Sequence, residues 1–504
     1  MRACSCGVGP DDQDDVSCFE IPATAHDPER LRPFAGARAW RRMRSAQRSA
    51  RRALAGRTVW TVNSTPAGGG VATMLHTLLP YLRGSGIDAR WVVVSAPPQF
   101  FAITKRIHNR IHGHVGDRAP LGAAEGAVYE RVLASAASEL AAVIRSNDVV
   151  ILHDPQTAGI VGPLKATGAT VLWRSHVGAD RPNALVQQAW DFLLPYLAEA
   201  DAFVFLRPAY VPRGLPAAPT GFISPSIDPC DPKSQPMPDA VAGAILEYAG
   251  IARPSETRTP RTFTKYDGTE GAVGRPAEVT RVGQGPQLHT NRIVLHVSRW
   301  DRLKDPAGVM RSFVQHTLPI ADAHLILAGP AALAVSDDPE AAEVFDEVRR
   351  DWSLLEEPQR KQVELVCLPV EDLDENAAIV NALQRQANVV VKKSLEEAFG
   401  LGVTEAMWKR RPVVATRVGG IRDQVQHGVS GLLVDDPTDL AAFGLAVGKL
   451  LHDEQLARRF GRAARARVRA RYLPDRQLSQ WLELLTRLVD GSDPVAPMSR
   501  PGVP

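Results

Sequence analysis

The chain has 504 residues, of which 44% are hydrophobic and 23% charged, a composition typical of a globular protein with at least two domains. Its net charge of +3 is small for this length and argues against general nucleic-acid binding, and no apolar run approaches the about 18 residues that a membrane span needs. Five cysteines, sparse and odd in number, and a first segment without the apolar core of a secretory signal favour reduced thiols and a cytoplasmic location.

The N-terminal region divides into two parts. Residues 1–28 are acidic and contain Gly and Pro, which predicts a disordered tail. Its possible metal ligands have no usual zinc-finger spacing, so we expect no zinc site from Cys4, Cys6, Cys18 and His26. The following segment, 29–56, carries nine arginines and has Trp40, Met43, Ala50 and Leu54 at near-helical spacing. It is either an arm for an acidic partner or, as we favour, a solvated helix whose apolar stripe packs on the next domain.

Two long stretches of the chain alternate apolar, β-rich runs with helix-like runs. They cover 57–240 and 292–475, and they predict an α/β protein with two doubly wound, Rossmann-like domains of parallel sheet. Two such domains are expected to face a central cleft, with ligands at the carboxyl ends of the strands. The segment 251–291 is rich in Gly, Pro, Thr and Arg and predicts an insertion or mobile linker. A C-terminal helix at 476–490 and a disordered tail at 491–504 complete the prediction.

The most informative segment of the chain reads SLEEAFGLGVTEAMWK and begins at Ser394. It contains two carboxylates, Glu397 and Glu405, with Gly400 between them. The pattern predicts a strand, a Gly-rich turn and then a helix that begins near Val403. Carboxylates accept hydrogen bonds from sugar hydroxyls, and free backbone N–H groups at a helix start bind phosphate. The segment therefore predicts a site for a sugar nucleotide.

Two other segments suit the phosphate part of such a ligand. Arg299 and Lys304 follow the first predicted strand of the second half, and two cations there suit a diphosphate leaving group. In the first half, Gly68, Gly69 and Gly70 follow a strand and let backbone N–H groups approach a ligand closely. This is not the G-x-G-x-x-G pattern of a dinucleotide site, and a plain tight turn is the alternative.

Polar side chains also end two neighbouring strands of the first half. The runs HDPQ and WRSH supply His153, Asp154, Gln156, Arg174 and His176. Parallel strands bring their carboxyl ends to one edge, where Asp154 could bind an acceptor hydroxyl and His176 could donate to the transferred sugar. Each histidine taken alone is equally compatible with a structural role.

One acidic pattern is read as structural. Asp372 and Asp374 have the D-x-D form of a metal site, but they fit the acidic start of a helix, so no metal is expected.

Together these motifs resemble the family-4 retaining glycosyltransferases of the GT-B fold, and more narrowly the trehalose synthases that join a nucleoside-diphosphate glucose to glucose. The resemblance covers roughly 57–485 and rests on NSTPAGGGVA, HDPQTAG, WRSH, SPSIDP, VSRWDRLKDP and EAFGLGVTEAMWK. It implies a hexosyltransferase with two small-molecule substrates, a sugar nucleotide and a sugar acceptor, and with no metal or other cofactor. Ala398 and Gly402 depart from the family's usual residues, which puts the sugar choice in doubt.

The resemblance also implies a role for each motif. Arg299 and Lys304 would hold the donor diphosphate, with Gly68 to Gly70 contributing near the phosphate and Gly400 and Leu401 in the same donor site. Glu405 would bind the ribose and Glu397 the transferred glucose, while Asp154 and His176 would lie near the sugar and the acceptor. His153, Gln156 and Arg174 would be on the acceptor side.

Several alternatives stay open. The acceptor could be a sugar phosphate or another glycoside, and the enzyme could be an epimerase or a phosphorylase of the same fold, although no cofactor lysine site for a phosphorylase is evident. A non-catalytic nucleotide-sugar binder is a further alternative. The sequence does not give the nucleotide base or the oligomeric state, of which a homodimer is one possibility.

Overall fold

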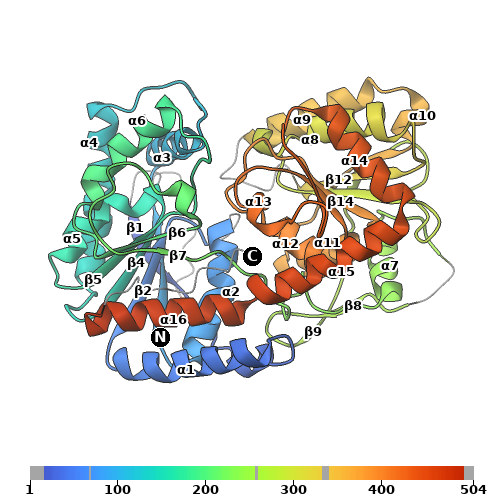
Figure 1. Ribbon diagram of the computed structural model, residues 1–504. Coiled ribbons are helices and arrows are strands. Elements are labelled where there is room, and N and C mark those ends of the chain that lie inside the picture. The colour runs from blue at the N-terminus through green and yellow to red at the C-terminus, as the bar shows by residue number, and fades with distance from the viewer. Residues whose placement is uncertain (1–15, 67–69, 256–258, 332–339, 493–504) are drawn as a thin grey trace. The chain divides into compact units, whose positions relative to one another are not determined.

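The computed structural model describes residues 16–66, 70–255, 259–331 and 340–492, which fall into two compact units (Figure 1). Unit 1 comprises Met1–Arg30, Ala37–Pro225 and Asp475–Pro504, and unit 2 comprises Leu31–Gly36 and Ser226–Pro474. Each unit is built around its own seven-stranded sheet. Among the described residues, no helix is both long and apolar enough to cross a lipid bilayer.

The sheet of unit 1 has the strand order β1-β3-β2-β4-β5-β6-β7, and only β1 is antiparallel to its neighbour. The strands are β1 (Ser17–Ile21), β2 (Thr58–Asn63), β3 (Asp88–Ser95), β4 (Val149–His153), β5 (Thr170–Arg174), β6 (Ala202–Phe205) and β7 (Thr220–Phe222). Every residue of β2, β4 and β6 is buried, as expected of strands covered on both faces. The helices are α1 (Ala37–Ala53), α2 (Gly70–Gly84), α3 (Pro98–Ile111), α4 (Ala123–Ala141), α5 (Val161–Lys165), α6 (Ala184–Leu193) and α16 (Pro474–Asp490).

The sheet of unit 2 has the strand order β10-β13-β12-β11-β14-β15-β16, again with a single antiparallel edge strand, β10. The strands are β10 (Glu278–Thr280), β11 (Ile293–Val297), β12 (His324–Pro330), β13 (Val363–Leu368), β14 (Val389–Lys392), β15 (Val413–Thr416) and β16 (Leu432–Val434). The helices are α7 (Asp239–Tyr248), α8 (Pro306–Ser312), α9 (Glu340–Ser353), α10 (Glu357–Arg360), α11 (Leu373–Gln386), α12 (Leu401–Trp408), α13 (Ile421–Gln424), α14 (Leu440–His452) and α15 (Glu454–Arg471). Because β11 and β14 are parallel neighbours, the loops that follow them meet at one edge of the sheet.

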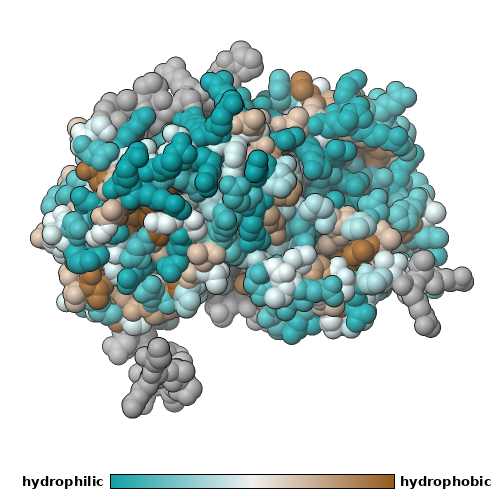
Figure 2. Space-filling view, turned by 90° about the horizontal axis from the view of Figure 1, so that it is seen from below, coloured by the Kyte–Doolittle hydropathy of each residue, from teal (hydrophilic) through white to brown (hydrophobic). Residues whose placement is uncertain are grey.

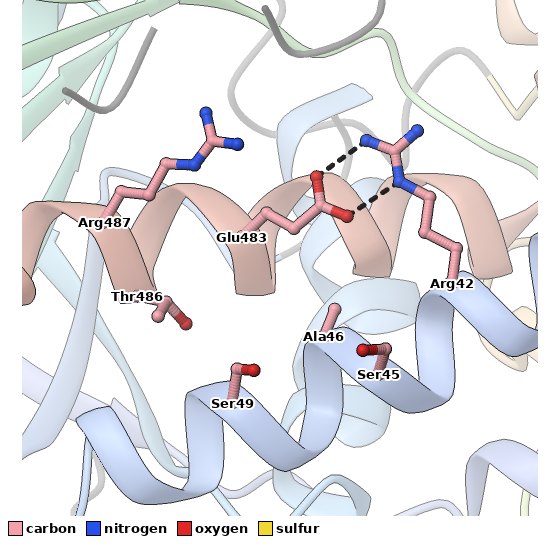
Figure 3. A pocket seen from close by; sticks show the side chains of 7 residues that line it. All are labelled: Arg42, Ser45, Ala46, Ser49, Glu483, Thr486 and Arg487. Carbon is pink, nitrogen blue, oxygen red and sulfur yellow. Dashed lines mark hydrogen bonds and ion pairs between the residues drawn. The ribbon is translucent and has the colours of Figure 1, made fainter. Parts of the chain in front are cut away.

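The arginine-rich segment forms α1, and its apolar stripe is packed as we favoured from the sequence. Met43 and Ala50 are fully buried, and the helix lies beside α16, where Arg42 and Glu483 form an ion pair of 2.7 Å (Figures 1 and 3). Figure 2 looks onto the side on which α1 lies and shows many hydrophilic side chains there. The stripe, and not the charge, decides how this helix packs.

The structure corrects the predicted N-terminal tail. Residues 17–21 within the expected tail at 1–28 form β1, which pairs with β3 from Ser17↔Ser95 to Ile21↔Trp91. An edge strand satisfies its backbone hydrogen bonds on one side only, so five residues with a partly polar pattern suffice, and the sequence signal is weak. Residues 22–28 are also described, and the His26 backbone N–H donates to the Pro80 carbonyl at 2.9 Å, whereas 1–15 and 493–504 of the predicted tails lie outside the described residues.

The predicted linker at 251–291 is also corrected. It contains the hairpin of β8 (Thr262–Thr264) and β9 (Glu270–Ala272), followed by β10, which joins the sheet of unit 2. Three-residue strands among Gly and Pro give no periodic pattern, so the sequence alone predicts a linker there.

Two predicted boundaries move as well. Residues 226–240, predicted in the first domain, cluster with unit 2, and the C-terminal helix predicted at 476–490 is α16, which clusters with unit 1.

Candidate functional site

The turn after β14 holds Glu397 between two lysines. Its carboxylate accepts a hydrogen bond from Lys304 Nζ at 3.0 Å and from Ser394 Oγ at 3.3 Å, and Lys392 Nζ lies 3.7 Å from Oε2. Burial alone would raise the pKa of Glu397, but Lys304 and Lys392 lower it to about 2. The carboxylate is therefore ionised throughout the physiological pH range and can accept hydrogen bonds from hydroxyls.

The loop after β11 meets this turn, as the register of the sheet requires. Leu395 donates its backbone N–H to the carbonyl of Leu303 at 2.7 Å, which joins the two loops directly. Asp305 ends the short turn Arg302–Lys304 with φ +47°, and its carboxylate both accepts the backbone N–H of Gly308 and pairs with the buried Lys393. These contacts fix the backbone on either side of Lys304.

The two predicted diphosphate ligands differ in their surroundings. Lys304 is largely buried, with 15% of its side chain exposed, whereas 42% of the Arg299 side chain is exposed. Arg299 pairs with Asp301 at 3.1 Å and keeps part of its guanidinium in solvent. Both cations belong to the loop after β11, as predicted.

Gly400 is the N-cap of α12, and the helix begins at Leu401 instead of near Val403. The glycine has φ +87°, and a Cβ atom there would lie 3.1 Å from Glu397 Cγ. The tight turn thus places the amino end of α12 close to Glu397. Free backbone N–H groups of a helix start bind negatively charged groups such as phosphate.

Glu405 projects from α12 into a buried polar network that the sequence did not reveal. Lys233 Nζ lies 3.7 Å from its Oε1, and Gln384 Nε2 lies 3.5 Å from its Oε2. Lys409 donates to Gln384 Oε1 at 2.6 Å, and burial lowers the pKa of Lys409 to about 7. Because two of these partners come from distant segments, neither sequence spacing nor a motif could have pointed to them.

In unit 1, Asp154 follows β4 in a strained backbone conformation. It has φ 63° and ψ −179°, a region that residues other than Gly rarely occupy. Its carboxylate accepts the backbone N–H of His176 at 2.6 Å, and burial raises the pKa of Asp154 to about 7. Strain and a perturbed pKa together are typical of functional positions.

The parallel pairing of β4 and β5 brings the two predicted histidines together. His153 pairs with Arg174 in the register, and His153 Nδ1 lies 2.9 Å from His176 Nε2 in a hydrogen bond. Burial lowers the pKa of both imidazoles well below the ordinary value, so both rings are neutral at physiological pH. Neutral rings can each donate one hydrogen bond and accept one.

The remaining predicted residues of unit 1 do not take part in the contacts among Asp154, His153 and His176. Arg174 is fully buried, its guanidinium lies 4.9 Å from the Trp481 ring centre, and it donates to the carbonyl of Ile223 at 3.2 Å. It therefore packs α16 against the sheet. Gln156 is half-buried in the turn after Asp154. Gly70 opens α2, whereas Gly68 and Gly69 lie outside the described residues.

One cavity of unit 1 involves none of these side chains. It measures about 270 Å³ and lies between α1 and α16, where Figure 3 shows Ser45, Ser49 and Thr486 around the Arg42–Glu483 ion pair. It opens widely to solvent and contains no strongly perturbed group. We therefore assign the candidate site to the two sets of strand ends.

The acidic D-x-D pattern has a structural role. Asp372 is the N-cap of α11, and its carboxylate accepts the backbone N–H groups of Asp374 and Glu375, each at 3.0 Å. Among the described residues, no group of three or more His, Cys, Asp or Glu side chains is arranged to hold a metal ion.

Comparisons with known proteins agree with this division of the chain. A family model described as "Trehalose synthase, N-terminal domain" matches residues 61–212, and one described as "Glycosyl transferases group 1" matches residues 283–467. The trehalose synthase of Rubrobacter xylanophilus is 33% identical over 440 residues, which cover 86% of this chain and 92% of that protein. The trehalose synthase of Pyrococcus horikoshii is 30% identical over 437 residues, which cover 86% of this chain and 91% of that protein.

Solved structures resemble this chain in fold. The crystal structure of an α,α-trehalose-phosphate synthase (UDP-forming) from Burkholderia vietnamiensis superposes with a TM-score of 0.62 at 15% sequence identity. The match covers 86% of this chain and 98% of that one.

Proposed function

The chain belongs to the trehalose synthase family and is a glycosyltransferase of the GT-B fold, and from this premise we propose that it transfers glucose from a nucleoside-diphosphate glucose to free glucose. The product would be α,α-trehalose. The observation that carries the proposal is Glu397, a largely buried carboxylate held ionised by two lysines next to the amino end of α12. Such a turn offers acceptors for the hydroxyls of a hexose and donors for a phosphate in one place.

Unit 2 would bind the donor. Lys304, Arg299 and the backbone N–H groups at the start of α12 would hold the diphosphate, and Glu397 would accept hydrogen bonds from hydroxyls of the glucose. Glu405 would accept hydrogen bonds from the ribose, with Lys233 Nζ 3.7 Å from its Oε1. Cations that are fixed before the reaction stabilise the charge that develops on the leaving group.

The proposed reaction exchanges one glycosidic bond for another. The bond between C1 of the glucose and the diphosphate oxygen breaks, and its electron pair stays on that oxygen. The hydroxyl oxygen on C1 of the acceptor glucose forms the new bond to C1 of the donor glucose, and the hydroxyl proton is released with the nucleoside diphosphate. Attack on the face from which the diphosphate leaves would retain the configuration, so an α-linked donor would give the α,α-linked disaccharide.

Unit 1 would contribute the groups that bind sugar hydroxyls. Asp154 would accept a hydrogen bond from the acceptor, and His176 would donate one to the transferred sugar. Both imidazoles are neutral, the pKa of Asp154 is about 7, and Arg174, the cation of this set, is fully buried against Trp481. That balance supports a neutral acceptor over a sugar phosphate, which requires cations.

The proposal includes no metal and no other cofactor, because Lys304 and Arg299 would supply the positive charge. It places the enzyme in the cytoplasm, where thiols stay reduced, because the five cysteines of the sequence are sparse and odd in number.

The test is a product assay with purified protein. UDP-, ADP- and GDP-glucose are each incubated with glucose, glucose 6-phosphate, glucose 1-phosphate or fructose, and the nucleoside diphosphate and the disaccharide are both quantified. We expect release of nucleoside diphosphate and formation of trehalose in equal amounts with glucose. A preference for a phosphorylated acceptor would overturn the acceptor assignment, and binding without turnover would overturn the enzymatic one.

A further inference from the structure

One of the two lysines next to Glu397, Lys392, is given no part in donor binding in the function proposed above. Lys392 is the last residue of β14, and 9% of its side chain is exposed. We propose that Lys392 is a further donor-site residue, which holds Glu397 ionised and in place while Lys304 engages the donor diphosphate. This inference rests on the proposed function and names a residue that decides how the glucose part of the donor is bound.

The geometry gives Glu397 one lysine on each oxygen. Lys304 Nζ lies 3.0 Å from Oε1, and Lys392 Nζ lies 3.7 Å from Oε2. Arg299 and Asp301 also act on Lys392, so this group has three cations and two carboxylates, an excess of one formal positive charge. A site that holds an uncompensated positive charge before the ligand arrives attracts a diphosphate.

The two lysines belong to different kinds of backbone. Lys304 ends a three-residue turn in the loop after β11, whereas Lys392 belongs to a strand in the centre of the sheet, between β11 and β15. The loop lysine can turn toward a diphosphate more readily than the strand lysine. When Lys304 is drawn to the diphosphate, Lys392 is the cation that remains next to Glu397. Without it, Glu397 would be a largely buried carboxylate with neither lysine beside it and an anionic ligand nearby, which is unfavourable.

The charged and titratable groups around Lys392 agree with this role. Glu397, Lys304, Arg299 and Asp301 act on it from the two loops, and the neutral His296 faces it from β11. Burial is the largest effect and lowers the pKa of Lys392 to about 8, although Glu397 opposes that shift. Lys392 is therefore charged below about pH 8 and loses its proton above it.

The experiment compares Lys392→Met with Lys392→Arg and with a matched control, Lys361→Met. Lys361 is an exposed surface lysine that pairs with Glu357 at 2.8 Å. Its replacement therefore removes a lysine–glutamate pair, as Lys392→Met does, but one that is far less buried than the pair of Lys392 and Glu397. Calorimetry measures the affinity for UDP-, ADP- or GDP-glucose and for the matching nucleoside diphosphate between pH 6.5 and 9.5. The ratio of the two affinities isolates the contribution of the glucose.

In the wild type the ratio should decrease above pH 8, where Lys392 loses its proton. We expect Lys392→Met to lower the ratio tenfold or more at pH 7 and to show no further decrease above pH 8. Lys392→Arg should restore the ratio at pH 7 and keep it constant up to pH 9.5, because the guanidinium does not lose its proton there. Lys361→Met should match the wild type. A ratio within twofold of wild type in Lys392→Met, or an unchanged decrease above pH 8 in that variant, would overturn the inference.

Binding and turnover separate this inference from the proposed function. If the wild type binds the donor with the expected ratio but forms no trehalose, the proposed function fails and the role of Lys392 stands. If the wild type forms trehalose and the ratio is unchanged in Lys392→Met, the proposed function stands and the role of Lys392 fails. Thermal unfolding of each variant shows whether the fold is intact.

Discussion

Replacing Gly400 by Ala tests the turn that brings Glu397 and α12 together. The residue has φ +87°, and the added Cβ would lie 3.1 Å from Glu397 Cγ and 3.3 Å from Ile421 Cγ1. A left-handed backbone costs a residue other than Gly about 1–2 kcal/mol, and the close contacts add to that cost. For a domain of this size about 1 kcal/mol corresponds to about 2–4 °C, so unit 2 should unfold about 2–8 °C lower.

Gly402→Ala is the matched control for this prediction. Gly402 lies two residues further on, inside α12, and the nearest atom to an added Cβ would be the carbonyl oxygen of Val297 at 4.0 Å. Ala loses less backbone entropy on folding than Gly, so this variant should be more stable by about 0.4–1 kcal/mol.

Calorimetric scans of both variants, with the affinity for a nucleoside-diphosphate glucose, provide the assay. Gly400→Ala should bind the donor more weakly because Glu397 is displaced, and Gly402→Ala should bind it as the wild type does. If Gly400→Ala unfolds at the temperature of the wild type, or if both variants change in the same direction, the account of this turn is wrong.

Three further predictions concern the chemistry. Glu405→Gln should lower kcat/KM by about 10²–10³, since one lost electrostatic contact in a preorganised site costs about 2.7–4 kcal/mol; near-wild-type turnover would remove Glu405 from the donor site. Asp154→Asn should reduce transfer to glucose more than donor binding, and it should remove a pH dependence of stability. The pKa of Asp154 is raised to about 7 in the folded protein, so its contribution to stability is full below about pH 4 and is lost as the pH rises to about 7; an unchanged stability profile in this variant would contradict the raised pKa. Finally, activity should survive EDTA; loss of activity with rescue by Mn²⁺ or Mg²⁺ would point back to Asp372 and Asp374.

The sequence predicted which residues of the candidate site lie at strand ends, and their roles in binding stay predictions. Glu397, Lys304, Asp154 and His176 all follow buried strands, and parallel pairing necessarily brings such residues to one edge of each sheet. The central strands were predictable for the same reason, because strands buried on both faces are continuously apolar.

The parts that the sequence missed depend on tertiary contacts. Lys233 reaches Glu405 from a segment without secondary structure, and Arg174 turned out to pack against a tryptophan of α16. A residue type and its spacing do not say which distant side chain it will meet. The sequence indicates a charged residue at the end of the apolar run 389–391, but two lysines follow that run. Only the structure shows that Lys392 lies next to Glu397 whereas Lys393 pairs with Asp305.

The position of α16 in unit 1 has a consequence for how the protein is made. Arg174 is buried beneath Trp481, yet about 250 residues of unit 2 separate the end of β7 from the start of that helix. At about 5–20 residues per second, the ribosome needs about 12–50 s to reach it. During that interval the nascent first unit exposes a guanidinium and the apolar surface that α16 later covers. A chaperone would therefore find its binding site on the half of the chain that is synthesised first, and chains that stop short of Trp481 should be degraded even though every strand of the first sheet is present.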